Sequence, residues 1–147
     1  MAIFKIDSRT SAGASTNSPC WGLLTTANHK VKILELKIVT GSATASEYSL
    51  GLAAAAGTQT SGVSGLSLSD LSTTSTTKVA TAWSAAPTVP TTFLEAVTFP
   101  ATIGSMVYWS FPDGGLFVPA SSELVLWNTG AGTNSAISHF SVTFEEL

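Results

Sequence analysis

The chain has 147 residues, of which 44% are hydrophobic and only 10% are charged, whereas an ordinary soluble domain carries about 25% charged residues. Six Lys and Arg against nine Asp and Glu give a net charge of −3, which excludes electrostatic binding of nucleic acid, because no polycation is present to displace counterions from a phosphate backbone. At this length we expect one domain, residues 1–147, whose core needs no metal or disulfide.

Short apolar runs, rich in β-branched and aromatic residues and separated by Gly, Pro, Asn and Ser/Thr clusters, predict an all-β chain. We expect a single-domain antiparallel β-sandwich of about eight to nine strands. In chain order these are residues 2–7, 20–25, 30–40, 47–53, 78–83, 92–99, 106–111, an interrupted pair 116–118 with 123–128, and 137–145.

Two of these segments also have helical features. Residues 30–40 carry apolar side chains at helical spacing, but their β-branched residues and the following Gly41 favour a long strand, bulged near Ile33 and Leu34. Residues 47–56 end in four alanines, the best helix formers, yet Gly51 and the alternation of apolar and small residues fit a strand at least as well.

The last segment has the clearest strand pattern, because Phe140, Val142 and Phe144 alternate with His139, Ser141 and Thr143. This period of two predicts one face in the core and one in water. Residues 105–118 are expected to form a hairpin around Pro112-Asp113-Gly114-Gly115, which supplies a fixed φ and two glycines able to adopt positive φ.

Two hydroxyl-rich connections separate the strands. Residues 8–18 follow the first strand, and residues 57–77 form a long Ser/Thr-rich loop whose only large apolar residues are Val63, Leu66, Leu68 and Leu71. Long loops are uncommon in a compact domain unless they bind something or are disordered, so we expect these leucines to pin the loop to a surface, its own or a neighbour's.

No enzymatic, metal or cofactor site is predicted. His29 and His139 lack a nucleophile motif around them and are interpreted as solvated, and no zinc or calcium spacing occurs. Two carboxylates facing each other could hydrolyse a glycoside. The candidate carboxylates are those of Glu35, Glu47, Glu95 and Glu123. We favour a structural role for them, in which they keep strand edges soluble and pair across strands with Lys32, Lys37 or Lys78.

The large aromatic residues allow two interpretations. Exposed tryptophans could stack on sugars, but each one lies in or beside an apolar strand. Burial in the sandwich core or at a subunit seam is therefore favoured for Trp21, Trp83, Trp109, Phe111 and Trp127.

The sequence contains no predicted targeting or membrane segment. The start, MAIFKID, reaches a charge within five positions and lacks an apolar h-region, and no run approaches the ~20 apolar residues of a membrane helix. The lone Cys20 cannot form a disulfide within the chain. We expect synthesis in the cytoplasm and no membrane partner.

Small side chains dominate the remaining composition: 21 Ser, 21 Thr, 19 Ala and 12 Gly make up 73 residues. Charged groups are costly to desolvate, whereas hydroxyls and methyls can be buried against another protein at little cost if the hydroxyls find partners. Small side chains also lose little rotamer entropy on immobilisation. The composition favours a subunit of a permanent assembly over a freely diffusing enzyme.

Two stretches resemble a known family. The first is VKILELKIV at residues 31–39, followed by ATAS at 43–46 and LGL at 50–52; the second is VPASSELVLWN at 118–128, followed by a Gly-rich turn and SVTFEE at 141–146. Together they resemble jelly-roll capsid decoration (cement) proteins of tailed bacteriophages, which sit as trimers on the outside of the head.

This resemblance implies a jelly-roll-like fold, a homotrimer, the major capsid protein as partner, and a place on the virion surface after synthesis in the host cytoplasm. It implies no catalytic residue. We expect capsid contacts at one end of the sandwich, from Ser11, Thr16, Thr60, Leu66, Leu68 and Leu71.

Two alternatives remain open. Jelly-roll trimers also build receptor- or carbohydrate-binding modules of phage tails and fibres, which would expose a cluster of aromatic and acidic residues. A β-sandwich glycan hydrolase would need two carboxylates on one concave face.

Overall fold

Thirteen strands run through residues 2–111, 114–130 and 135–147, the parts of the chain that the computed structural model describes. All of their pairings are antiparallel. In chain order they are β1 (Ile3–Arg9), β2 (Ser18–Leu24), β3 (Val31–Thr40), β4 (Ser46–Leu52), β5 (Thr58–Gln59), β6 (Val63–Ser67), β7 (Thr74–Ala80), β8 (Trp83–Ala85), β9 (Phe93–Phe99), β10 (Met106–Ser110), β11 (Leu116–Val118), β12 (Glu123–Asn128) and β13 (Ser138–Glu146).

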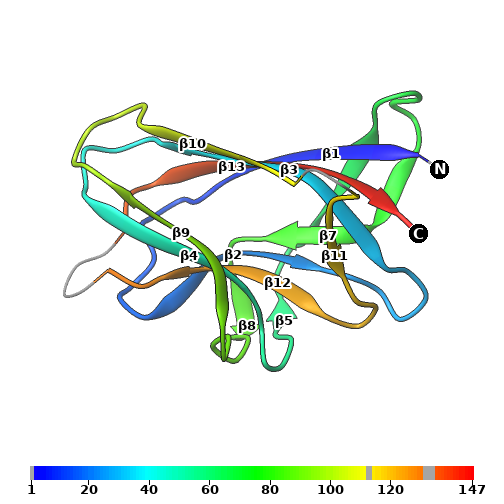
Figure 1. Ribbon diagram of the computed structural model, residues 1–147, viewed down its shortest axis with the longest axis horizontal. Helices are drawn as coiled ribbons and strands as arrows, with labels where there is room; N and C mark the ends of the chain where they lie inside the picture. The colour runs from blue at the N-terminus through cyan, green and yellow to red at the C-terminus, as the bar shows by residue number, and fades with distance from the viewer. Residues whose placement is uncertain (1, 112–113, 131–134) are drawn as a thin grey trace.

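Eleven of these strands form one sheet that folds over on itself. Its order is β10-β3-β13-β1-β6-β7-β2-β12-β4-β9, with β11 also paired to β3. Figure 1 shows β10, β3, β13 and β1 in an upper layer and β2, β12, β4 and β9 in a lower one. The strands β6 and β7 join the layers along one side, and the free edges β9 and β10 lie on the other. The predicted antiparallel β-sandwich is confirmed.

The core lies between the layers and is built around aromatic rings. Phe140 of the upper layer lies 6.3 Å from Trp21 and 6.1 Å from Tyr48 of the lower layer, measured between ring centroids. All three side chains are fully buried, and burial of a large apolar side chain contributes roughly 1.5–3 kcal/mol. The Tyr48 hydroxyl donates to the Ala136 carbonyl at 3.0 Å, and burial raises the pKa of this phenol.

The predicted alternation of β13 is confirmed on its core face but wrong on the other. Phe140, Val142 and Phe144 are buried in the core, whereas Ser141 and Thr143, expected in water, are only 6% and 8% exposed. The reason is that β13 is a central strand. Long side chains of β3 and β1 flank both hydroxyls in register: Lys37 and Asp7 beside Ser141, Glu35 and Lys5 beside Thr143.

Both segments with helical features are strands. In β3, Glu35 pairs with Thr143 and Ile33 with Phe144, which leaves Leu34 as an extra residue. The predicted bulge near Ile33 and Leu34 is therefore confirmed. Residues 46–52 form β4, which pairs with both β12 and β9.

The predicted hairpin over residues 105–118 is wrong. Instead of pairing with each other, β10 and β11 both pair with β3, the first along Glu35–Val39 and the second along Val31–Ile33. They act as one strand interrupted opposite the β3 bulge. Gly114 and Gly115 have the expected positive φ, 115° and 82°, while Pro112 and Asp113 lie outside the described residues.

The predicted pairing of 116–118 with 123–128 as one interrupted unit is also wrong. The chain changes layer between them, because β11 joins β3 in the upper layer and β12 lies between β2 and β4 in the lower one. Nothing in the apolar pattern marks this crossing, which Ser121 makes with a φ of 54°.

The expected long loop over residues 57–77 is mostly β-structure, containing β5, β6 and the first half of β7. The hydrophobic pattern does not predict these strands, because they are rich in Ser and Thr. Backbone pairing and buried hydroxyls hold them in place. For example, Ser75 accepts from the Gly65 amide at 2.7 Å and donates to the Thr77 carbonyl at 2.7 Å. The strand count of thirteen, above the eight or nine expected, arises from β5, β6 and β8 and from the separation of β11 and β12.

Buried hydroxyls recur across the fold, since twelve Ser and Thr residues of the described part of the chain are buried. Several of them bind loops to strands. Thr25 donates to the Pro119 carbonyl at 2.6 Å, Ser46 accepts from the Ala136 amide at 2.6 Å, and Thr10 accepts from the Ser138 amide at 2.9 Å. Part of the hydroxyl-rich composition therefore holds this chain together internally.

The described residues include no helix able to span a membrane.

Glu146, near the C-terminus, connects β13 to β7 at one end of the sandwich. Its carboxylate accepts hydrogen bonds from the Thr77 amide at 2.5 Å, the Thr76 amide at 3.2 Å and the Thr76 hydroxyl at 3.0 Å. Partial burial raises the pKa of this carboxyl, but the hydrogen bonds from Thr77 and Thr76 outweigh it and the net pKa is lowered.

We therefore expect Glu146→Gln to lower the free energy of unfolding at neutral pH by about 1 kcal/mol. A carboxyl whose pKa is lowered by folding stabilises the protein above its unfolded pKa, ordinarily 4.5, and loses that effect as the pH falls through the folded value. Urea unfolding of both proteins between pH 7 and pH 3 should show the difference shrinking below about pH 5. A difference that stays constant over this range would contradict the assignment.

Candidate functional site

The free edges β9 and β10 and the connection between them carry five exposed large apolar side chains. We call edge surface the group formed by Phe93 and Leu94 of β9, Ile103 of the connection, and Met106 and Tyr108 of β10. Leu94 is 52% exposed, Met106 62% and Ile103 67%. Figure 1 shows the two strands diverging from the connection between them, on the open side of the sandwich.

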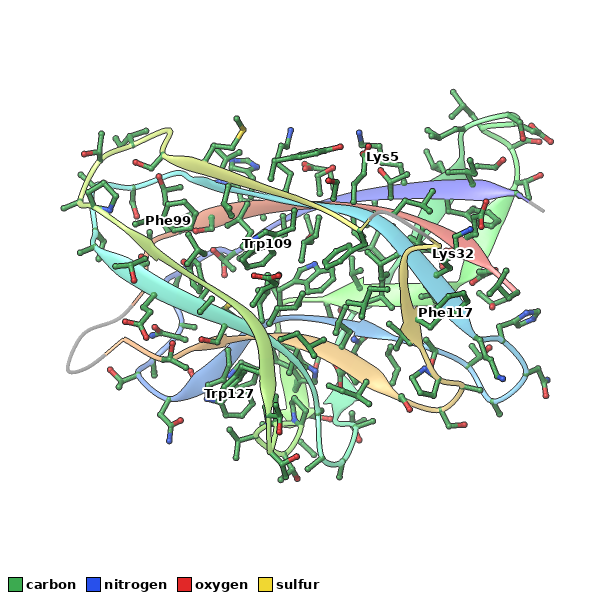
Figure 2. The ribbon with its side chains drawn as sticks, viewed as in Figure 1. Lys5, Lys32, Phe99, Trp109, Phe117 and Trp127 are labelled. Atoms are coloured by element: carbon green, nitrogen blue, oxygen red, sulfur yellow. The ribbon has the colours of Figure 1, made fainter. Side chains whose placement is uncertain are left out.

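Beneath the edge surface, the core is only partly covered. Val97, Val107, Trp109, Phe111 and Leu116 pack against the buried core but remain half-exposed. Figure 2 shows Trp109 pointing from β10 into the space between the layers. Trp109 and Phe111 thus lie at the margin of the core, next to the unpaired edge.

The edge surface has a polar margin on its β10 side. Tyr108 pairs in register with Lys37 of β3, and its phenol has a raised pKa because of a hydrogen bond with the Glu35 carboxylate. On the opposite side, Glu95 of β9 is exposed. The β10 margin therefore carries a basic and an acidic side chain, and the β9 margin an acidic one.

A second exposed apolar group lies at the tip of the β6–β7 hairpin. We call hairpin tip the residues Leu66, Leu68 and Leu71, which are 46%, 56% and 68% exposed. The turn between them is held by Asp70, whose carboxylate accepts from Ser72 and Thr73, and these hydrogen bonds lower the pKa of Asp70. The turn is thus ordered, and it presents leucines to solvent.

The six expected capsid contacts do not meet at one end of the sandwich. Ser11 and Thr16 are exposed on the connection after the Arg9 end of β1, while Leu68 binds the Ile3 carbonyl at the other end of that strand. At ~3.3 Å per residue the two ends of β1 are about 20 Å apart. Thr60 is exposed at a third place, where its amide binds the Ala82 carbonyl. Only Leu66, Leu68 and Leu71 stay together.

Glu123 was expected at a strand edge but is fully buried on the central strand β12. Its carboxylate accepts hydrogen bonds from the Gly57 amide at 2.7 Å, the Trp83 indole Nε1 at 2.8 Å and the Gln59 amide Nε2 at 2.9 Å. Charge-assisted hydrogen bonds of this kind are what allow a carboxylate to be buried without a cation. Glu123 therefore ties β5 and β8 to the outer side of the lower layer.

Gly22 of β2 makes room for this cluster. A Cβ atom at Gly22 would collide with the Glu123 carboxylate and lie 2.9 Å from the Trp83 ring. Beside the cluster is an open groove of about 490 Å³, lined by Leu24, Gly57, Thr58, Gln59, Ser61, Gly62 and Lys78. Because three donors within the protein bind the Glu123 carboxylate, it acts as a structural tie.

The tryptophans occupy four different environments. Trp21 is in the core, as expected. Trp127 is buried, but on the outer side of β12, where its indole Nε1 donates to the Asn17 side chain at 2.9 Å (Figure 2). Trp83 is half-buried against Glu123. The expected burial in the core is confirmed for Trp21, Trp109 lies at the margin of the core, and Trp83 and Trp127 lie on the outer side of the lower layer.

The residues considered for metal binding, thiol chemistry and ion pairing do not form one site in the described part of the chain. The described residues contain no group of three or more His, Cys, Asp or Glu that could hold a metal ion. Cys20 is buried, and burial strongly raises the pKa of its thiol, so a reactive thiolate is disfavoured. The expected pairing of Glu35, Glu47, Glu95 or Glu123 with Lys32, Lys37 or Lys78 is wrong, because within the described part of the chain the ion pair of Lys32 is with Glu145, at 2.7 Å across β13 and β3.

The Glu123 cluster leads to a stability prediction. Glu123→Gln replaces one acceptor oxygen with an amide group, which leaves a buried N–H donor unpaired, so we expect the free energy of unfolding to fall by about 1.5–3 kcal/mol. Urea unfolding measures this. The matched control is Glu95→Gln, an exposed position on β9; equal losses in both variants would show that Glu123 does not tie β5 and β8 to the lower layer.

Comparison of this chain with protein-family models, with curated proteins and with solved structures found no match.

Proposed function

We propose that this protein is a structural subunit without catalytic activity: a decoration protein that binds the major capsid protein of a tailed phage as a homotrimer and stabilises the head. The observation that supports this proposal is the presence of two separate exposed apolar surfaces, the edge surface and the hairpin tip. Exposed apolar patches of this kind mark interaction sites. A subunit that binds both its own copies and a second protein needs two such surfaces.

The positions of the two surfaces suit these two tasks. The edge surface borders the unpaired strands β9 and β10, whereas the hairpin tip lies at the far end of the molecule, beyond the N-terminal end of β1 (Figure 1). A contact made through one leaves the other free. We assign the edge surface to the sister protomers and the hairpin tip to the capsid.

Three weak contacts in one trimer are enough for firm attachment. Each protomer offers three exposed leucines at its hairpin tip, a small contact by itself. Linking three such contacts raises avidity by ~10²–10⁴ over a single one, because the second and third binding events are intramolecular. A trimer that bridges neighbouring capsid subunits must be detached at several points before those subunits can separate under the pressure of packaged nucleic acid.

One observation favours the alternative of a receptor- or carbohydrate-binding module. The groove beside Glu123 is lined by the polar side chains of Thr58, Gln59, Ser61 and Lys78, and its volume of about 490 Å³ falls in the range of small-ligand sites. No aromatic ring lines it, and a sugar platform would need one. The alternative therefore ranks second.

Purified particles of the phage that encodes this chain provide the main test. We expect hundreds of copies per particle by quantitative mass spectrometry, and we expect particles stripped of the protein to break at lower temperature or under milder osmotic shock. A handful of copies, or unchanged particle stability, would contradict the decoration role. Glycan-array binding combined with absence from heads would favour the receptor-binding alternative.

Substitutions at the hairpin tip test the capsid contact. Leu68→Asp and Leu71→Asp place a charge on exposed side chains, so the fold should persist while binding to stripped heads weakens on the order of tenfold or more, because the change is repeated in every linked contact. The matched control is Val89→Asp, since Val89 is also exposed but lies outside both surfaces. Equal binding by all three variants would remove the hairpin tip from the contact.

A further inference from the structure

The groove beside the Glu123 cluster is bordered by a buried acceptor that the protein leaves unpaired. Gln59 of β5 donates its side-chain Nε2 to the Gly22 carbonyl at 3.1 Å and to the Glu123 carboxylate at 2.9 Å. A flipped amide would place its oxygen against these two acceptors, so the orientation of the side chain is fixed. Its Oε1 is buried and has no hydrogen-bond partner within the described residues. An unpaired buried acceptor costs free energy that a bound donor can recover.

Gly62 and Lys78 lie beside this acceptor. A Cβ atom at Gly62 would lie 3.0 Å from Gln59 Oε1 and 3.1 Å from Lys78 Cβ, so even a methyl group here would fill the space between them. Lys78 is exposed and forms no ion pair within the described part of the chain. Since its long, flexible side chain lies next to the closed-off Oε1, movement of that side chain gives a ligand access to the acceptor.

The rest of the groove suits a small hydroxylated ligand. Thr58 and Ser61 contribute exposed hydroxyl groups, and Leu24, the register partner of Lys78, contributes an apolar side chain. The volume of about 490 Å³ is within the range of small-ligand sites. Because the described lining residues include no aromatic ring, binding here depends on hydrogen bonds and charge and not on ring stacking.

Two acidic residues bonded to or next to the lining residues are already engaged. Glu123 is bound by three donors of the protein, and Glu146 is bound by Thr76 and Thr77, which precede Lys78 on β7. Within the described residues neither carboxylate pairs with Lys78. The Lys78 ammonium is the one charged group among the described residues that line the groove, and it remains available for a single anionic group.

We propose that this groove binds an acidic sugar, a ring with one carboxylate and neighbouring hydroxyl groups, as in a uronic acid residue. The carboxylate pairs with the Lys78 ammonium, one sugar hydroxyl donates to Gln59 Oε1, and further hydroxyls bond with Thr58 and Ser61. A simple carboxylate would leave Oε1 unpaired, and a neutral sugar would leave Lys78 unpaired. This binding activity goes beyond the stabilisation of heads and does not rest on it.

Titration of the full, isotope-labelled chain with sodium glucuronate tests the site, and glucose is the neutral control. We expect glucuronate to shift the NMR signals of the Gln59 side-chain amide and the Gly62 backbone amide. Glucose should bind on the order of tenfold more weakly, because it lacks the charge that pairs with Lys78. A parallel titration with N-acetylalanine, which carries a carboxylate beside an N–H donor, tests a peptide terminus as the ligand.

Two substitutions remove separate parts of the site. Lys78→Gln removes the charge, and Gly62→Ala fills the space beside Gln59 Oε1 without changing charge. Each should weaken glucuronate binding on the order of tenfold or more. The matched control is Lys5→Gln, which makes the same change at an exposed position on β1 in the upper layer and should leave binding unchanged. Circular dichroism verifies folding, and Lys78→Gln, at an exposed position, keeps the test valid if Gly62→Ala does not fold.

Failure of glucuronate to bind would overturn the proposal, as would equal binding of glucose or an affinity that Lys78→Gln leaves unchanged. Tighter binding of N-acetylalanine would also overturn it, by replacing the sugar with a peptide terminus. These outcomes are separable from failure of the proposed function. A Lys78→Gln variant that loses glucuronate but still attaches to stripped heads supports the groove site and leaves the decoration role standing. A wild type that binds glucuronate but not heads supports the site and contradicts that role.

Discussion

Burial of both inner faces of one folded sheet against each other is the constraint on which this structure depends. Trp21, Tyr48 and Phe140 meet at centroid distances near 6 Å, and they require β2 and β4 to lie directly across from β13. Since the sheet follows a single path from β10 to β9, folding it over one side at β6 and β7 leaves its two ends open on the other. The exposed apolar edge surface is therefore a consequence of how the core is closed.

Outside that core, hydrogen-bonded polar groups hold the outer strands and the connections in place. Glu123, buried without a cation, uses three N–H donors from Gly57, Gln59 and Trp83 to hold β5 and β8 on the lower layer. Glu146 closes one end of the sandwich through Thr76 and Thr77. Buried hydroxyls bind the connections to the strands in the same way. The edge surface and the hairpin tip group several exposed apolar side chains each, while others, such as Phe117 and Val89, are exposed outside both.

Predictions from the sequence succeeded where the local side-chain pattern by itself determines the backbone conformation. The all-β class, the core face of β13 and the β3 bulge all follow from alternation and β-branched residues. Predictions failed where pairing depends on long-range register: the expected 105–118 hairpin is two strands on β3, and the expected 57–77 loop contains β5, β6 and part of β7. Of the site residues, the leucines of the hairpin tip stayed together, while Ser11, Thr16 and Thr60 did not join them.

Composition and alternation in this chain determine that it forms strands, that it carries few charges, and that its apolar residues suffice for a core. Only the tertiary structure decides which residues lie at the free edges and which carboxylates are buried. Glu95 and Glu123 are both strand glutamates, yet one is exposed on β9 and the other is fully buried on β12. The physical reason is that exposure depends on a strand's neighbours in the sheet, and those neighbours come from distant parts of the sequence.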